Sequence, residues 1–398
     1  MCADIIIAEI QEENKMLLLA IIYLSFISLG LPDALLGAAW PTMCIQFDVP
    51  VSYAGAISMI VSAGTIISSL LSDRMTRWLG TGKVTAISVC TTAVALFGFS
   101  ISTEYWMLLL WAVPMGLGAG SVDAALNNYV ALHYTSRHMS WLHCMWGLGA
   151  SIGPYILGYA LSSGQTWNMG YRYISIIQVV LTAALFISLP LWKRRTAAAE
   201  ENGEASHALS LREILAIPGA KEVLVAFFCY CAVEQTAMLW ASTYLVGHLG
   251  MGEEQAAGLA SLFFIGITSG RAASGFLTYK LSDANMIRLG QAIIVAGIAM
   301  MVLPLGNLAA MVGLLLIGLG CAPIYPCIIH STPEHFGAEN SQALIGVQMA
   351  SAYIGTLAMP PLFGLIANHI TVSLMPAYLA AITVLMIVMC ERLNKKSA

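Results

Sequence analysis

Long apolar runs recur along the chain and are separated by short polar intervals. Each run has the length of about 20 residues that an α-helix needs to cross the hydrocarbon core of a bilayer. The predicted spans lie near residues 17–41, 51–72, 83–102, 105–131, 141–162, 171–192, 220–246, 255–279, 286–305, 307–331, 341–367 and 372–391. A break at Pro304, Gly306 and Asn307 separates the ninth span from the tenth. The pattern therefore predicts an all-α integral membrane protein with twelve transmembrane helices.

Composition supports a membrane protein and narrows its chemistry. The 398 residues are 59% hydrophobic and 10% charged, with a mean hydropathy of +0.80, whereas soluble domains average about 25% charged residues. The nine cysteines show no zinc-ligand spacing, so we expect neither a metal nor another cofactor. The basic residues form no patch with interleaved aromatic residues, which argues against a nucleic-acid partner.

A polar interval divides the predicted spans into two sets of six. It covers residues 193–219, begins KRRTAAAEENGEASHALS and has no apolar period, so we interpret it as a cytoplasmic linker. The LREILAIPGAKEVL stretch that follows is amphipathic and is expected to lie along the membrane surface. The predicted parts are a leader over 1–16, an N-terminal bundle over 17–192, the linker, a C-terminal bundle over 220–392 and a tail over 393–398. The acidic leader lacks the basic region of a cleavable signal peptide.

The two halves also repeat each other. Gly270 follows Gly64 by 206 residues and Pro360 follows Pro154 by the same interval, while Gly318 follows Gly116 by 202. Two pseudo-symmetric six-helix bundles, related by an axis along the membrane normal, form a known transporter plan with substrate bound near the midplane.

Orientation follows from the distribution of Lys and Arg. Arg74, Arg137, Arg212 and Lys280 lie in intervals on one side of the predicted topology, and Arg172 lies on the other. Because cytoplasmic loops are enriched in Lys and Arg, we place both termini in the cytoplasm of a cell inner (plasma) membrane protein.

A polar residue interrupts the fourth span, within the stretch Pro114–Tyr129. Asp123 and Asn127 are one helical turn apart and share a face. An ionised side chain at membrane depth costs about 2.5–3.5 kcal/mol, so it persists where it faces a bundle interior or a watery cavity. We interpret this face as one wall of a polar cavity.

Two further spans carry acidic residues. Glu234 lies near the middle of the seventh span, where desolvation disfavours a charged carboxylate and suits a group that takes up and releases a proton; the alternative is a fixed structural hydrogen bond. Asp33 follows Pro32, which breaks the helix, so Asp33 either accepts a substrate hydrogen bond or satisfies loosened backbone. Arg271, in the eighth span, either snorkels or pairs with an acid such as Glu334.

The same residues carry a family resemblance. The stretch Ser69-Leu-Leu-Ser-Asp73-Arg74-Met-Thr-Arg77 resembles the G-x-x-x-D-R-x-G-R motif of the major facilitator superfamily, with Ser69 and Thr76 replacing the glycines. Tyr230-x-x-x-Glu234 and Asp123-x-x-x-Asn127 resemble motifs of its fucose–galactose–glucose proton symporter family and of sodium-coupled glucose relatives. The segments 142–154 and 318–326 resemble that family as well.

One departure concerns the first span. The family's acidic residue there corresponds to Gly37 of this chain, and Asp33 stands where asparagine is expected. The resemblance implies that Asp73, Arg74 and Arg77 latch helices in one conformational state. Their alternative role is that of ordinary charges at the cytoplasmic end of a helix.

A sugar site needs amides or carboxylates for the hydroxyls and aromatic rings for the apolar sugar faces. The nominated substrate-binding residues are Asn127, Trp146, Gln235, Trp240, Tyr325 and Gln348. Packing or an interfacial belt is the alternative for each aromatic residue, and we assign Trp40, Trp106, Trp167 and Trp192, at span ends, to such belts. His143 either joins a proton relay with Asp123 or forms a structural hydrogen bond.

The resulting hypothesis is a monomeric secondary transporter that works by alternating access. It would bind a small, sugar-like molecule and a proton, carried by Glu234, Asp123 or Asp33. The alternatives are a sodium-coupled sugar symporter and a proton-coupled efflux antiporter of drugs or metabolites. The antiporter is favoured by Gly149-x-x-x-Gly153-Pro154-x-x-x-Gly158, which resembles a span-five motif of drug–proton antiporters.

An enzyme is not expected. Gly149-Ala-Ser151-Ile-Gly153 has the letters of a nucleophile elbow but lies inside a predicted helix rather than at a strand-to-helix turn. The chain also lacks the G-x-x-x-x-G-K loop that would bind a nucleotide.

Overall fold

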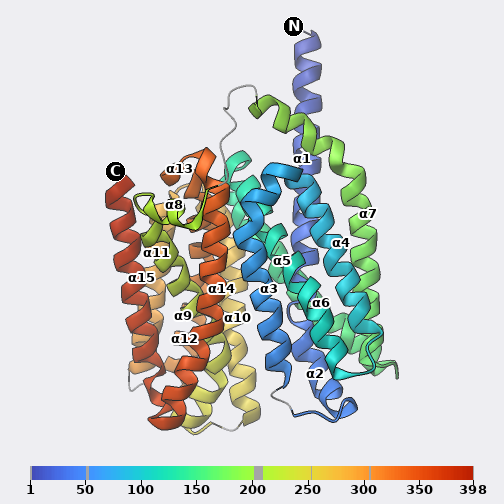
Figure 1. The fold of residues 1–398 in the computed structure, drawn as a ribbon. Coiled ribbons are helices and arrows are strands. Elements are labelled where there is room, and N and C mark those ends of the chain that lie inside the picture. Colours follow the sequence, from blue (N-terminus) through green and yellow to red (C-terminus); the bar gives the residue numbers. More distant parts are fainter. Residues whose placement is uncertain (1, 51–52, 201–208, 252, 304–305, 398) are drawn as a thin grey trace. The chain divides into compact units, whose positions relative to one another are not determined.

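The computed structural model describes residues 2–50, 53–200, 209–251, 253–303 and 306–397 (Figure 1). Over these residues the chain is helical almost throughout and contains no strand. The helices are α1 (Cys2–Gly30), α2 (Leu35–Gln46), α3 (Ala54–Leu79), α4 (Thr81–Ser100), α5 (Tyr105–His133), α6 (Ser136–Ser162), α7 (Trp167–Glu200), α8 (Leu211–Ala216), α9 (Ala220–Leu249), α10 (Glu253–Leu277), α11 (Asp283–Val302), α12 (Asn307–His330), α13 (Thr332–Phe336), α14 (Ala338–His369), η2 (Val372–Leu374) and α15 (Met375–Ser397).

These helices occupy the positions of the predicted spans. Among the described residues, ten helical stretches are long and apolar enough to cross a membrane. The predicted fifth and eighth spans, which are not among these ten, correspond to α6 and α10. The first turns of α6 carry Arg137 and His138, and the apolar part of α10 runs over Leu262–Leu277. The chain leaves α11 at Val302 and begins α12 at Asn307, so the predicted cut between the ninth and tenth spans is confirmed. The all-α membrane fold is confirmed as well.

The first helix extends beyond the first predicted span. Helix α1 begins at Cys2 and runs without a break into that span, so the backbone of residues 2–16 is continuous with it. The predicted disruption at Pro32 is present: the helix ends at Gly30, a turn follows, and α2 begins at Leu35. Residues 201–208 of the predicted linker lie outside the described residues, and α8 forms in the amphipathic stretch after it, capped by Ser210.

The chain divides into two compact units. The first contains Met1–Tyr129 and Met145–Ala208, and the second contains Val130–Cys144 and Leu209–Ala398. The end of α5, its connection to α6 and the start of α6 therefore pack with the second unit, although both helices continue into the first.

Close helix packing at glycines occurs in both units at corresponding places. In the first unit Gly116 of α5 lies against the Val61 carbonyl of α3, where a Cβ atom would overlap that oxygen. In the second unit Gly318 of α12 lies in the same way against the Phe263 carbonyl of α10. Small residues let membrane helices approach this closely. The repeat seen in the sequence is thus a repeat of helix contacts.

A second pair of glycines shows the same correspondence. Gly149 of α6 packs on the Ile27 carbonyl of α1, and Gly355 of α14 packs on the Phe228 carbonyl of α9. The Gly149–Gly153 sequence therefore serves helix packing inside α6, as its helical position predicted.

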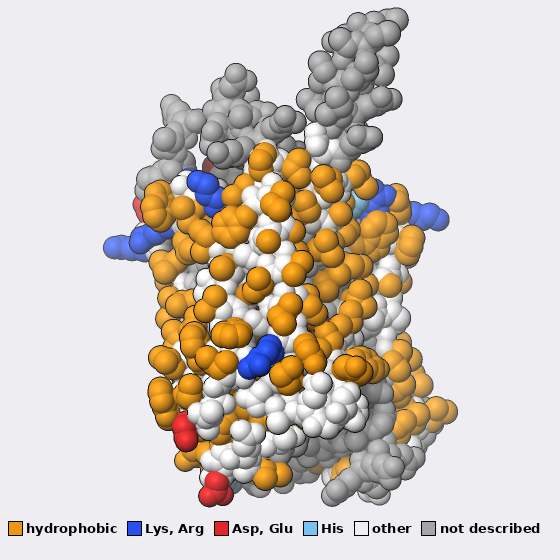
Figure 2. Space-filling model, turned by 90° about the vertical axis from the view of Figure 1, so that its right-hand side faces the viewer, with side chains coloured by type: hydrophobic (Ala, Val, Ile, Leu, Met, Phe, Trp, Pro, Cys, Tyr) orange, Lys and Arg blue, Asp and Glu red, His pale blue; other side chains and the backbone are white. Residues whose placement is uncertain are grey.

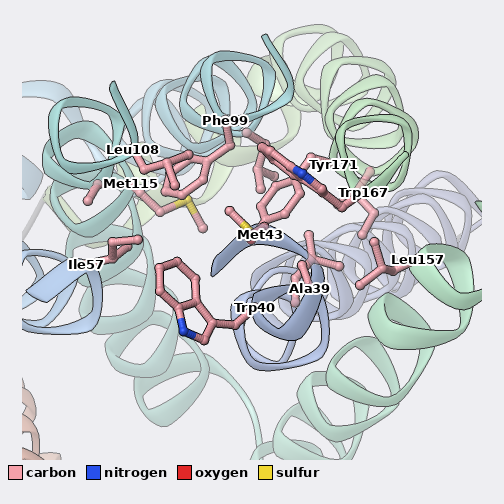
Figure 3. Packing of buried hydrophobic residues seen from close by; sticks show 14 of the residues in the cluster. Ala39, Trp40, Met43, Ile57, Phe99, Leu108, Met115, Leu157, Trp167 and Tyr171 are labelled. Atoms are coloured by element: carbon pink, nitrogen blue, oxygen red, sulfur yellow. The ribbon is translucent and has the colours of Figure 1, made fainter. Parts of the chain in front are cut away.

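The belt assignment is wrong for most of the span-end tryptophans. Trp40 and Trp167 belong to a buried hydrophobic cluster of the first unit (Figure 3). The Trp167 indole is fully buried and donates a hydrogen bond to Gln46 Oε1 at 2.8 Å. Trp192 is also buried, whereas Trp106 is 61% exposed, as a belt residue should be. Position along a span did not distinguish the rings that face neighbouring helices from the ring that faces outward.

The outer surface is rich in apolar side chains. On the face shown in Figure 2, hydrophobic side chains extend over most of the height and charged ones are few. In α6 and α7, Tyr155 and Ile187 are each 80% exposed and Val180 is 65% exposed. Soluble monomers rarely expose such large contiguous apolar areas, so this surface is suited to contact with lipid chains.

We predict that Gly116→Ala lowers stability by about 1–3 kcal/mol, because the added methyl group overlaps backbone that cannot move aside cheaply. The measurement is the thermal unfolding midpoint of the purified protein in detergent. Gly158→Ala is the matched control, since no described atom lies within 4 Å of its Cβ position; it should be neutral or slightly stabilising. Equal midpoints for the two variants would contradict the close α3–α5 approach.

Candidate functional site

A buried ion pair lies in the second unit. Arg271 of α10 donates from Nη2 to Oε1 of Glu234 in α9 at 3.1 Å, and the two side chains are only 6% and 8% exposed. Either charge alone would be strongly unfavourable at this depth, whereas together they compensate each other. Of the two expectations for Arg271, pairing with an acid is confirmed, but the acid is Glu234 rather than Glu334. Any role of Glu234 therefore involves this arginine as well.

Aromatic side chains surround the pair within the same unit. The ring of Tyr325 in α12 lies 4.4 Å from that of His143, 4.7 Å from Phe227 and 5.8 Å from Tyr230, measured between centroids. Tyr230 is fully buried, one helical turn before Glu234, and interacts electrostatically with both members of the pair. This cluster of rings limits the water that reaches the two charges.

The first unit contains a carboxylate–indole contact. Trp146 of α6 donates from Nε1 to Oδ2 of Asp33 at 2.7 Å. Asp33 stands in the turn that follows α1, and Gly30 lets the end of α1 lie directly against the Trp146 carbonyl. Asp33 is exposed and Trp146 is half-buried. The contact fixes the orientation of the indole and leaves both groups accessible, as a stacking and hydrogen-bonding surface requires.

Asp123 and Asn127 bond to each other on α5. Asn127 donates from Nδ2 to Oδ1 of Asp123 at 2.8 Å and to the Asp123 carbonyl at 2.9 Å. Asp123 is 5% exposed and Asn127 is fully buried. The shared helix face predicted from their spacing is confirmed. Both side chains are buried, and the role of the pair in proton coupling stays a prediction.

The other nominated residues are held by protein contacts. Gln348 is fully buried and its Nε2 donates to Thr332 Oγ1 at 3.0 Å. Trp240 donates from Nε1 to the Pro360 carbonyl at 3.0 Å. Gln235, next to Glu234, is half-buried. Substrate binding by Gln348 or Trp240 would require these bonds to be exchanged.

The charged motif after the second span is organised within one helix. Arg77 donates from Nε to Oδ1 of Asp73 at 2.9 Å, one turn apart on α3, and Arg74 is exposed. Asp73 is 6% exposed, so it is firmly placed at this end of α3. The latch between helices that the resemblance implied stays a prediction.

The sequence identified Glu234 and Tyr325 as candidates but did not reveal which residues lie between them. Arg271 and His143 complete this site, and both had been left with open roles. The available signal was an arginine and a glutamate in consecutive antiparallel spans, each deep within an apolar run.

The comparison with known families decides the class of protein. Residues 22–360 and 223–396 match the family model described as Major Facilitator Superfamily. The chain belongs to the major facilitator superfamily. It is accordingly a multi-pass membrane transporter and not an enzyme, as predicted.

Its relatives in this superfamily include named sugar transporters. The chain is 21% identical to sodium-dependent glucose transporter 1A of Mus musculus, over 87% of this chain and 89% of that protein. It is 21% identical to the glucose/mannose transporter GlcP of Bacillus subtilis, over 76% and 77% of the two chains.

Solved structures show the same fold. FucP in the outward conformation has a TM-score of 0.74 and 15% identity, covering 94% of this chain and 99% of that one. The proton:xylose symporter XylE has a TM-score of 0.77 and 11% identity, covering 93% and 94%. At these identities the likeness establishes the shared fold.

We predict that Glu234→Gln destabilises the protein by about 3–5 kcal/mol, because it leaves the charge of Arg271 buried and uncompensated. Arg271→Gln should destabilise it by less, because Glu234 can then take up a proton. The double variant should be more stable than either single variant, which thermal unfolding in detergent at neutral pH would measure. Glu391→Gln is the control, because its pair with Arg288 is solvent-exposed and should contribute little. Additive single and double effects would show that the two charges are not coupled.

Proposed function

We propose that the protein is a secondary transporter that couples proton movement to transport of a monosaccharide or sugar derivative by alternating access. The observation that carries the proposal is the buried pair of Glu234 and Arg271. A carboxylate in an apolar interior is stabilised either by a neighbouring cation or by a proton. Glu234 can therefore exchange one for the other, which is the chemistry of a coupling site.

The exchange has a consequence for Arg271. When Glu234 takes up a proton, the guanidinium loses its charged partner and must be satisfied by other oxygen atoms, such as water or substrate hydroxyl groups. The protonated and deprotonated states then favour different arrangements of α9 and α10. A ligand shifts a conformational equilibrium only by its different affinity for the two states, and here the proton supplies that difference.

A sugar is the substrate that the first unit suits best. Asp33 offers a carboxylate to hydroxyl groups, and the Trp146 ring that it orients offers a flat apolar face. Asn127 and Asp123 lie deeper in the same unit. The glucose transporters among the relatives and the proton-symporter fold of XylE support this choice.

The membrane placement completes the proposal. We infer a monomer in the cell inner (plasma) membrane with both termini cytoplasmic and the linker of residues 193–219 on the same side. The distribution of Lys and Arg along the chain supports this orientation. Substrate and proton would then enter from outside and leave into the cytoplasm.

The test is uptake into proteoliposomes that contain a pH-sensitive dye, across a panel of hexoses, deoxyhexoses and their derivatives. We predict sugar-driven acidification of the lumen in the wild type and none with Glu234→Gln, because the glutamine cannot carry a proton. Glu104→Gln is the matched control, since Glu104 is an exposed residue between α4 and α5; it should transport like the wild type.

Other outcomes would replace the proposal. Uptake that needs sodium and does not respond to pH would move the protein to the sodium-coupled alternative. No response to any sugar, with exchange of lipophilic cations for protons, would establish the efflux antiporter instead.

We also predict that Trp146→Phe raises the KM for sugar about fivefold, because the ring remains but loses the hydrogen bond that orients it, worth about 1 kcal/mol. Trp146→Ala should raise the KM further, since it removes the stacking surface. Trp106→Phe, on the exposed surface, is the control. A KM that is unchanged in Trp146→Ala would remove this ring from the binding site.

A further inference from the structure

One short segment of the chain is packed differently from the helices that contain it. Val130–Cys144 comprises the end of α5, the connection and the start of α6, and it belongs to the second unit. The residues before and after it belong to the first unit. Any movement of one unit relative to the other must therefore either lift this segment from its contacts or bend the chain at its two ends.

A polar anchor holds the middle of the segment. Ser136 donates from Oγ to Oδ1 of Asp283, the first residue of α11, at 2.5 Å. The other carboxylate oxygen, Oδ2, lies 2.5 Å from Nδ1 of His330, the last residue of α12. The second ring nitrogen of His330, Nε2, lies 3.2 Å from the Tyr134 carbonyl of the segment.

These contacts determine the protonation state of His330. A carboxylate and a carbonyl are both hydrogen-bond acceptors, and a neutral imidazole has only one N–H to donate. Both bonds are formed together only when the ring holds two N–H groups and is an imidazolium. The bond to Asp283 is then charge-assisted and among the stronger kinds of hydrogen bond. A proton on His330 thus fastens the segment to α11 and α12 at once.

An aromatic anchor holds the neighbouring part of the segment to α10 and to the turn after it. Arg137 donates to the Tyr279 hydroxyl, and its guanidinium lies 4.8 Å from the centre of that ring. Trp141 packs edge-on against Phe276 at 5.9 Å. Gly275 of α10 makes room for the indole, since a Cβ atom there would overlap Trp141.

A cysteine lies beneath the segment. Cys327 of α12 is fully buried, and its Sγ is 3.9 Å from Ser136 Oγ. Lifting Ser136 away would uncover this thiol, so its reactivity reports whether the segment is seated.

We propose that Val130–Cys144 is a catch that must open during the transport cycle and that a proton on His330 keeps closed. Ser136, Arg137 and Trp141 are its positioning residues, and Asp283, Tyr279 and Gly275 form their seat. The catch lies at the end of the second unit that carries Lys280, which the Lys and Arg distribution assigns to the cytoplasm. Cytoplasmic acid would close it and cytoplasmic alkali would release it.

The charges around His330 agree with this sign. The negative charges that face the ring are those of Asp283 in α11 and Glu334 in α13. The segment presents the Tyr134 carbonyl to it, and the cation of the segment, Arg137, is engaged by Tyr279. Cys327 lies about one helical turn before His330 on α12. Ser136 contacts both the Cys327 thiol and the Asp283 carboxylate that binds His330.

The experiment measures alkylation of Cys327 by N-ethylmaleimide in the full-length protein in lipid nanodiscs, with the modified site identified by mass spectrometry. At pH 5.5 we expect His330→Gln to label about fivefold to tenfold faster than the wild type, the size expected for loss of a charge-assisted hydrogen bond. At a pH high enough to remove the proton from His330, the two proteins should label alike. Because the same thiol is compared at the same pH, the dependence of its own reactivity on pH cancels. His330→Lys, which keeps a cation at this position, should label slowly at both pH values.

A second variant tests the catch without touching the histidine. Gly275→Ala displaces Trp141 and should raise Cys327 labelling at both pH values, whereas Gly158→Ala, which meets no described neighbour, should not. Equal labelling of the wild type and Gly275→Ala, or of the wild type and His330→Gln at pH 5.5, would overturn the proposal. Neither measurement needs a substrate or Glu234, so its outcome is independent of the proposed symport.

Discussion

The cost of isolating a charge in an apolar interior constrains this protein more than any other interaction. Glu234 and Arg271 are tolerated in α9 and α10 because each compensates the other at 3.1 Å. Replacing both with apolar residues would satisfy the fold equally well or better, since buried ion pairs are weak contributors to stability. In the symport that we propose, the pair allows a change of state when one proton is added.

The constraint shapes the surroundings as well. A buried ion pair at membrane depth needs close packing around it, so that water does not compensate either charge in place of its partner. Glycines supply that packing: Gly318 brings α12 against α10, and Gly355 brings α14 against α9. The first unit uses Gly116 and Gly149 in the corresponding contacts. The duplication thus provides two similar scaffolds, and only the second holds the Glu234–Arg271 pair.

The fold was predictable from the sequence to a large extent, and the site only in part. Span length, the break before Asn307 and the helical disruption at Pro32 depend on local composition, so the pattern of residues was sufficient. The partner of Arg271 depends on which helices are neighbours and on how each is rotated, which no single span encodes. The same limit explains Trp167, whose place at a span end could not reveal that it faces Gln46 and the core.

The proposed coupling site and the proposed catch share structural elements. Arg271 and Gly275 are one turn apart on α10, and Tyr279 lies in the turn that directly follows the end of this helix at Leu277. A helix moves largely as a rigid rod, so a shift of α10 when Arg271 loses its partner would also move Gly275 and Tyr279, which seat the catch. His143 strengthens the connection, because it lies in the segment Val130–Cys144 and contacts the Tyr325 ring beside the ion pair. Protonation of Glu234 and release of the segment Val130–Cys144 are then both coupled to one displacement of α10, whose position each of the two sites favours or opposes.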